Sequence, residues 1–230
     1  SLADAQNINA NAELGDVIKV QIQSKEFGRI ATQNAKNVIL QKIREEERKV
    51  LYDQYYGMEK EVVTGIVQRI MGKNVSVNLG KADAILSEKE QVRGEEFQPT
   101  ERIKVYILEV KDTPKGPRIE VSRTHPGLVK RLFESEVAEV KDGTVEIKSI
   151  AREAGSRTKI AVWSNDPDVD PVGACVGMNG ARVNSVVEEL RGEKIDIINW
   201  DENPAILIEN ALSPAKVIAV MADPDEKTAL

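Results

Sequence analysis

Residues 172–198, VGACVGMNGARVNSVVEELRGEKIDII, constrain the fold most strongly, because glycines at 177 and 180 separate two segments of helical periodicity. Before the glycines, Asp170 and Pro171 have the residue types of a helix cap and a first helical position. After them, apolar spacing of three and four predicts a helix that buries Val183, Val186, Val187 and Leu190. Gly192 ends that helix, and residues 194–198 alternate like a strand. The stretch therefore predicts a short helix, a tight bend, a second helix and a strand.

This order of elements resembles the K-homology (KH) RNA-binding module. In such a module the glycine loop, here residues 177–180, lets a nucleic-acid backbone approach the peptide groups because no Cβ blocks it. Its amides, beside a helix N-terminus, can contact phosphate oxygens. KH loops often carry a basic residue between the glycines, whereas this chain has Met178 and Asn179, so we expect modest affinity. The predicted RNA-binding residues of the module are Val176, Gly177, Met178, Asn179, Gly180, Arg182 and Ile195, with Val183 in the apolar floor.

The composition limits the kind of protein this chain can be. With 230 residues, 41% of them hydrophobic, it can bury more than one small core. The formal net charge of −6 argues against bulk electrostatic capture of nucleic acid, so RNA contacts would depend on local charge placement. Cys175, the single cysteine, falls on an apolar helix face and excludes an internal disulfide, which fits a cytoplasmic location. We find neither an apolar run approaching the roughly 18 residues of a membrane span nor a signal-peptide pattern.

We expect residues 1–57 to be the C-terminal part of an N-terminal domain. Residues 17–22 alternate like one strand without an obvious partner, so we expect the front of this domain to lie outside the chain. Residues 30–56 predict a long connector helix, packed along an apolar stripe and solvated opposite it, where the run EEERK lies. Gly57 ends this helix. The stripe comprises Ala31, Ala35, Val38, Ile39, Ile43, Val50, Leu51 and Tyr55.

Residues 58–124 have the pattern of five short strands, which predicts a small barrel. The strands are expected at residues 63–70, 75–79, 82–86, 102–110 and 119–122. The segments GIVQRIMGKNVSVNLGKADAILS and RIEVSR resemble the S1-type OB fold, a barrel that binds single-stranded RNA. That family places aromatic residues around the first hairpin, where this chain has Met71 and Asn74, so we expect little base stacking. Arg69, Lys73 and Lys81 remain candidates for phosphate contacts.

Residues 125–202 supply the rest of the first KH module. Pro126 is expected to start one continuous helix that buries Leu128, Val129, Leu132, Phe133, Val137 and Val140. A turn at 141–143 leads into a strand that begins at Val145, and a second strand is expected at 158–163. The resulting order is helix, strand, strand, helix, glycine loop, helix, strand. It resembles the prokaryotic-type (type II) KH fold.

The tail, residues 203–230, repeats the start of this plan. An apolar helix is expected at 205–212, a break at Ser213 and Pro214, and a strand at 216–222. We interpret the tail as the start of a partial second KH domain. The fold class predicted for the chain is therefore α+β and multidomain: a connector helix, a five-stranded S1-type OB barrel, a type II KH domain and a partial second KH domain.

Two patterns could suggest other chemistry. Asp166, Asp168 and Asp170 alternate as the first ligands of a calcium loop do, but the sixth and twelfth positions hold Pro171 and Gly177 instead of glycine and glutamate. We therefore expect a solvated loop with a helix cap and no metal. His125 is the single histidine, so a Ser-His-Asp triad would have to use it, and a place at the start of the next helix is favoured. No catalytic residue and no cofactor are predicted.

The order of modules, with the segments IATQNAKNVILQKIREEER and VGACVGMNGARVNSVVEELRGEKIDII, resembles the NusA family of bacterial transcription elongation, termination and antitermination factors. The resemblance extends over residues 15–222. It implies a protein that is not an enzyme and binds single-stranded nascent RNA on a surface formed by the barrel and the KH modules. It further implies RNA polymerase and other Nus-type antitermination factors as partners, a monomer, and no membrane.

Two alternatives remain open at this point. Phosphorolytic RNA-degrading enzymes carry KH and S1-type modules as accessories, although there the KH module precedes the barrel and a nuclease core is present. The second alternative is an interaction scaffold whose modules have lost RNA binding, which the uncharged glycine loop and the missing aromatic residues allow.

Overall fold

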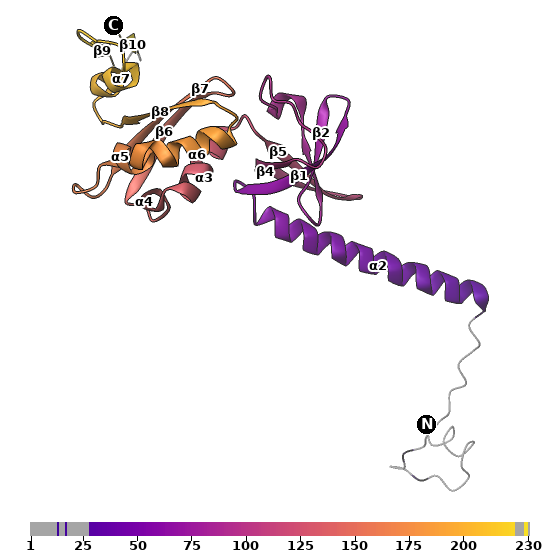
Figure 1. The fold of residues 1–230 in the computed structure, drawn as a ribbon. Helices are drawn as coiled ribbons and strands as arrows, with labels where there is room; N and C mark the ends of the chain where they lie inside the picture. The colour runs from indigo at the N-terminus through magenta and orange to yellow at the C-terminus, as the bar shows by residue number, and fades with distance from the viewer. Residues whose placement is uncertain (1–12, 14–16, 18–27, 224–227, 230) are drawn as a thin grey trace. The chain divides into compact units, whose positions relative to one another are not determined.

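A computed structural model describes residues 13, 17, 28–223 and 228–229 (Figure 1). The strand predicted at residues 17–22 lies outside this range except for residue 17. The chain divides into two compact units, residues 1–46 and residues 47–230. Within the second unit, a barrel is followed by a module of three strands and several helices.

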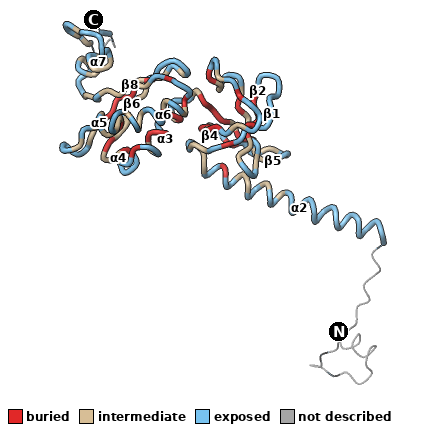
Figure 2. The backbone as a smooth tube through the Cα atoms, in the orientation of Figure 1, coloured by how far each residue is buried: buried red, intermediate tan, exposed pale blue. Residues whose placement is uncertain are grey.

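The predicted connector helix is confirmed as α2, Arg29–Tyr56. Its C-terminal turns pack into the barrel: Tyr55 is buried and its hydroxyl donates to the Leu79 carbonyl oxygen at 3.1 Å. Among the described residues, the apolar stripe is packed only at this end of the helix, where it contacts the barrel core. Most of α2 is exposed (Figure 2). The prediction of a stripe packed along its whole length is wrong at Val38, Ile39, Ile43 and Val50, which are exposed.

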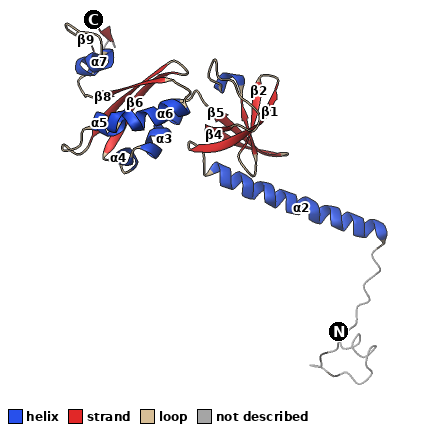
Figure 3. Cartoon of the chain, viewed as in Figure 1, coloured by secondary structure: helices blue, strands red, loops and turns tan. Residues whose placement is uncertain are grey.

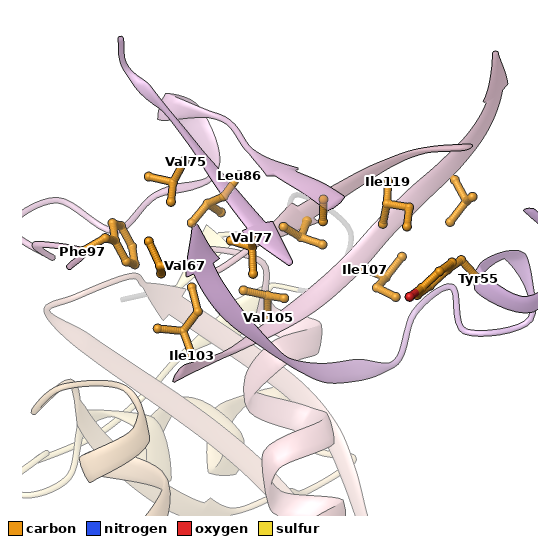
Figure 4. Packing of buried hydrophobic residues seen from close by; sticks show 13 residues of the cluster. Tyr55, Val67, Val75, Val77, Leu86, Phe97, Ile103, Val105, Ile107 and Ile119 are labelled. Carbon is orange, nitrogen blue, oxygen red and sulfur yellow. The ribbon is translucent and has the colours of Figure 1, made fainter. Parts of the chain in front are cut away.

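The barrel is closed, as the five predicted strands required. Its strands are β1 (Val62–Met71), β2 (Asn74–Asn78), β3 (Asp83–Leu86), β4 (Arg102–Thr113) and β5 (Gly116–Ser122). They pair in the order β1-β2-β3-β5-β4, with β3 and β5 parallel. A short 3-10 helix, Glu88–Glu90, follows β3. Alternate side chains turn inward and form one core, shown in Figure 4, that includes Val67, Val77, Leu86, Ile107 and Ile119.

The second module has the predicted KH order. Its elements are α3 (Pro126–Glu136), α4 (Ala138–Lys141), β6 (Val145–Glu153), β7 (Arg157–Ser164), α5 (Pro171–Val176), α6 (Ala181–Glu189) and β8 (Lys194–Asn199). The sheet order is β6-β7-β8, with β6 antiparallel and β8 parallel to β7. Helices α3, α5 and α6 lie against one face of this sheet (Figure 3). The other sheet face is left without helices from this module.

The helix that starts at Pro126 is interrupted, which corrects the prediction of one continuous helix. Val137 has φ −118° and ψ 108°, an extended conformation that separates α3 from α4. Both Val137 and Val140 are nevertheless buried in the predicted core. The apolar spacing therefore identified the buried residues correctly, but spacing alone does not report a one-residue break, since the side chains on both sides of it reach the same core.

The tail forms helix α7, Pro204–Leu212, as predicted. The strand predicted at residues 216–222 is wrong, because only β9 (Ala222–Asp223) is extended and paired there. Its partner among the described residues is the equally short β10, Thr228–Ala229. A strand needs a hydrogen-bonding neighbour along its length, and the apolar run before β9 has none in the described part of the chain. The partial second KH domain remains a prediction.

A fully buried ion pair stabilises the KH sheet. The guanidinium of Arg152 donates to both carboxylate oxygens of Glu193, each at 2.9 Å, and both side chains are 1% exposed. Burial raises the pKa of Glu193, but hydrogen bonds from Arg152, Gly155 and Thr158 outweigh that effect and leave its pKa below the ordinary value of 4.5. The stabilisation from this pair is therefore complete above that ordinary value and is lost as the pH falls through the lower folded-state pKa.

We predict that Glu193→Gln lowers the free energy of unfolding at pH 7 by about 3–5 kcal/mol, because Arg152 is left buried without a counter-charge. Chemical denaturation at pH 7 and at several pH values below 4.5 measures both the loss and its pH dependence. The variant should lose less stability than the original chain on acidification. Glu188→Gln, at an exposed position of α6, is the control and should change neither value. Equal stability of the two variants at pH 7 would contradict this account.

Candidate nucleic-acid interface

The glycine loop has a backbone that most residues avoid. Helix α5 begins at a cap, where the Asp170 carboxylate accepts from the Val172 N–H at 3.1 Å, as predicted. The loop then takes positive φ values at three of its four positions: 73° at Gly177, 53° at Asn179 and 77° at Gly180. Asparagine tolerates this region better than most side chains, and glycine has no penalty there. The residue types at these positions are therefore matched to the bend.

Both glycines also have close neighbours. A Cβ on Gly177 would lie 2.8 Å from the Cγ of Arg182, and one on Gly180 would lie 3.2 Å from the side-chain nitrogen of Asn184. The loop consequently turns directly over the first turn of α6. Its glycines are therefore required by the packing beneath the loop.

The outer side of the loop is open to solvent. Met178 is 87% exposed and Asn179 is also exposed. Gly180 occupies the N-cap of α6 and provides no side-chain oxygen to the first amides of that helix. A helix N-terminus without a cap carries partial positive charge and unused N–H donors. The loop can therefore present backbone amides to an anionic oxygen.

The structure places Arg182 differently from what the sequence suggested. One guanidinium nitrogen donates to the Ala174 carbonyl oxygen at 2.7 Å and to the carboxylate of Glu139, on α4, at 3.0 Å. The side chain thus covers the C-terminal end of α5 beneath Gly177, and its charge is balanced by Glu139. Its first structural task is to connect α4, α5 and α6. Because Glu139 already neutralises its charge, the Arg182 guanidinium offers little net positive charge to a phosphate.

The apolar side chains predicted for the floor of the groove are only partly buried. Val176 ends α5, Val183 lies on α6 and Ile195 lies on β8, and all three have intermediate exposure. Val183 and Ile195 pack against the same KH core. These residues come from three consecutive elements of the module, so they leave apolar surface on the elements that flank the glycine loop.

The barrel residues belong to the other module. Arg69 is exposed on β1, and Lys73, in the turn that follows, pairs with Glu88 at 2.8 Å. Both aromatic residues of the barrel segment are buried. Phe97, 8% exposed, lies in the barrel core, whereas Tyr106, 7% exposed, faces out of the barrel and packs against the KH core. Among its described residues the barrel therefore exposes no aromatic side chain, and little base stacking stays a prediction.

The sequence reasoning missed a buried residue that helps to connect the two modules. Arg123, directly after β5, is 1% exposed and donates to the Glu95 carboxylate at 2.8 Å. It also donates to the Lys104 carbonyl oxygen at 2.7 Å and to the Glu189 carbonyl oxygen, on α6, at 3.0 Å. The sequence signal was a charged residue at the end of the alternating strand RIEVSR. Its partners are 19, 28 and 66 residues away in the chain, so no local pattern identifies them.

Other chemistry has little support in the described residues. Burial raises the pKa of the Cys175 thiol to about 11, which keeps it protonated and unreactive at neutral pH. Among the described residues, no group of three or more His, Cys, Asp or Glu side chains is placed to hold a metal ion. None of the helices in that part of the chain is both long and apolar enough to cross a membrane.

A closed five-stranded barrel followed by a KH-type module with an exposed glycine loop defines a class of modular RNA-binding proteins of the S1 and KH type. Three family models match the chain: the NusA N-terminal domain at residues 1–49, the S1 RNA binding domain at 57–122 and the NusA-like first KH domain at 123–200. With the relatives described next, these matches show that the chain belongs to the NusA family.

Three relatives share the name "Transcription termination/antitermination protein NusA". The chain is 54% identical to that of Bacillus subtilis over 227 residues, covering 99% of this chain and 61% of the relative. It is 52% identical to that of Halalkalibacterium halodurans, covering 99% and 60%. It is 43% identical to that of Thermus thermophilus, covering 100% and 59%. The chain therefore spans about three fifths of the length of these relatives.

We predict that Gly177→Ala destabilises the KH module by more than the about 1–3 kcal/mol that its backbone conformation alone would cost a residue with a side chain, because the new methyl group also displaces Arg182. Gly143→Ala is the matched control, since Gly143 also has positive φ, 84°, but a Cβ there meets nothing within 4 Å. Chemical denaturation of both variants measures the difference. If Gly143→Ala were the more destabilising change, the packing described for Arg182 would be wrong.

Proposed function

We propose that this chain is the RNA-binding part of a bacterial transcription factor and acts in termination and antitermination. The proposal rests on the family, on the two modules, and above all on one observation: the glycine loop is exposed beside an uncapped helix N-terminus. The chain spans 61% of its relative from Bacillus subtilis. We therefore propose the activity and partners of the whole protein by analogy with that relative, which is named as a termination and antitermination protein.

The geometry suggests how RNA would lie. A phosphate oxygen accepts from the amides of the glycine loop and of the first turn of α6, where Gly177 and Gly180 have no side chain to block its approach. The neighbouring bases then lie against the partly exposed apolar surface of Val176, Val183 and Ile195. A KH groove of this kind holds about four nucleotides. Single-stranded nascent RNA is the ligand that fits, because a paired base could not reach this surface.

The chain would function without catalysis. No residue is assigned a catalytic role and no cofactor is invoked. The proposed partners are nascent RNA, RNA polymerase and other Nus-type factors, and the proposed state is a monomer in the cytoplasm. The net charge of −6 is compatible with this function if the protein is held at polymerase, since tethering replaces electrostatic capture by a high effective concentration. Arg69, Lys73 and Lys81 of the barrel would then add weak phosphate contacts.

We predict that the double change Met178→Asp and Asn179→Asp weakens binding of single-stranded RNA on the order of tenfold or more, because two carboxylates face the phosphates. Both side chains are exposed, so the fold should persist, which circular dichroism checks. Met178→Asn is the control, since it gives an uncharged pair of the same shape. It should bind RNA like the original chain. If the folded double variant bound RNA as tightly as this control, the glycine loop would not be the binding site.

A second candidate, an interaction scaffold without RNA binding, is favoured by the charges around both predicted sites. Arg182 is paired with Glu139 and Lys73 with Glu88. Titration of labelled single-stranded RNA at low and then at higher salt separates the two functions. The RNA-binding function requires an affinity that falls as the salt concentration rises, because phosphate contacts release counterions. A chain that binds no RNA even at low salt would be a scaffold.

A further inference from the structure

Both tryptophans of the chain meet at one place that the glycine loop does not use. Trp163 lies on β7, where the neighbouring Val162 points into the core under the helices, so Trp163 points to the opposite sheet face. Trp200 directly follows β8, and its backbone N–H donates to the Val162 carbonyl oxygen at 2.8 Å. The two indole rings are 5.7 Å apart between centroids and inclined by 85°. They form two adjoining aromatic walls, of which Trp163 is 42% exposed.

These walls border a cavity of about 500 Å³. Pro167 and Pro171 add apolar surface to its lining, and Asp166 and Asp201 add carboxylates. The volume lies in the range of about 300–1,000 Å³ that small-ligand sites occupy, and it exceeds what a single side chain requires. An open cavity with two aromatic walls and a polar rim is suited to a flat group that can stack and also donate hydrogen bonds.

The charge of the cavity is negative. Asp166 and Asp201 each accept one backbone N–H, from Asp168 at 2.9 Å and from Asn203 at 2.7 Å. Neither carboxylate has a cationic partner among the described side chains. Lys148 lies over the Trp200 ring, and its ammonium is already paired with Glu146. The cavity thus combines two aromatic faces with two carboxylates whose charge is not balanced.

This combination selects against a nucleic-acid strand. A stacked base would bring its phosphates toward Asp166 and Asp201, and like charges repel. It favours a cation that is flat, since a guanidinium stacks on an indole face and presents two parallel N–H groups that match a carboxylate, whereas an ammonium has neither the flat face nor the planar fork. The position of Lys148 illustrates the attraction, because its Nζ lies 5.7 Å from the centroid of the Trp200 ring.

We propose that the cavity between Trp163 and Trp200 binds an arginine side chain of a basic peptide segment in a protein partner. The guanidinium stacks against an indole ring, and Asp166 and Asp201 balance its charge. The site lies at the ends of β7 and β8 and on the loop before α5, and it is independent of the glycine loop. The KH module would then contact a protein through one surface and RNA through another.

The chain's own fluorescence reports on this site, since its two tryptophans are both in it. The full chain is titrated with a blocked tetra-arginine peptide and, separately, with blocked tetra-lysine, with excitation at wavelengths that tyrosine does not absorb. The expected result is a saturable change in emission with tetra-arginine and binding weaker on the order of tenfold with tetra-lysine. Equal affinity for the two peptides would overturn the assignment to arginine.

Variants separate this site from general attraction to an acidic protein. Asp166→Asn with Asp201→Asn keeps the acceptor oxygens for the two backbone N–H groups, and it should weaken tetra-arginine binding on the order of tenfold. Glu136→Gln with Glu188→Gln removes the same charge at exposed positions elsewhere and should leave the binding unchanged.

Equal weakening in the two charge variants would overturn the proposal. A single-stranded oligouridine that changes the emission of the original chain, where tetra-arginine does not, would also overturn it and assign the cavity to RNA. Trp163→Phe, which keeps an aromatic wall, shows by circular dichroism and by the remaining Trp200 emission that loss of binding is not loss of fold. This variant should bind tetra-arginine more weakly but retain part of the affinity, and unchanged affinity in the folded protein would contradict stacking on Trp163.

Discussion

The left-handed bend at residues 177–180 is the constraint on which the candidate site depends. Positive φ at Gly177, Asn179 and Gly180 reverses the chain within four residues, so that α5 and α6 can both pack on the same sheet face. The bend also aims the uncapped N-terminus of α6 outward while Arg182 is held beneath it. Replacing either glycine would disturb both the packing and the accessible amides. Both the packing of the loop and the proposed RNA contact therefore require glycine at positions 177 and 180.

Two buried arginines complete the framework around this bend. Arg152 pairs with Glu193 inside the KH module, and Arg123 links Glu95 of the barrel segment to α6 through the Glu189 carbonyl oxygen. Buried ion pairs add little net stability compared with apolar contacts, but they tolerate few alternative arrangements because each broken pair leaves an unsolvated charge. We infer that these two arginines mainly fix the positions of the strands and helices near the candidate site. Their net contribution to the free energy of unfolding is the smaller effect.

The sequence predicted much of this fold because its periodicities are strong and local. The alternation within residues 58–124 located all five barrel strands, and the spacing around residues 172–198 located the glycine loop with its two helices. The missed features depend on contacts between distant residues. The break at Val137 and the absence of a strand before Ala222 depend on which neighbours are present, which spacing does not encode. The engagement of Arg182 by Glu139 is likewise a contact across 43 residues, so the sequence could suggest its charge but not its partner.

The central claim is that an RNA backbone lies against the bare amides of the glycine loop. Mapping amide chemical shifts of the isotopically labelled chain during titration with a short single-stranded RNA tests it most directly, because each backbone N–H is observed separately. The account predicts that the largest changes fall on residues 178–182, with smaller ones at Val176 and Ile195. Binding of the RNA that leaves the amides of residues 178–182 unchanged, while others shift, would contradict it.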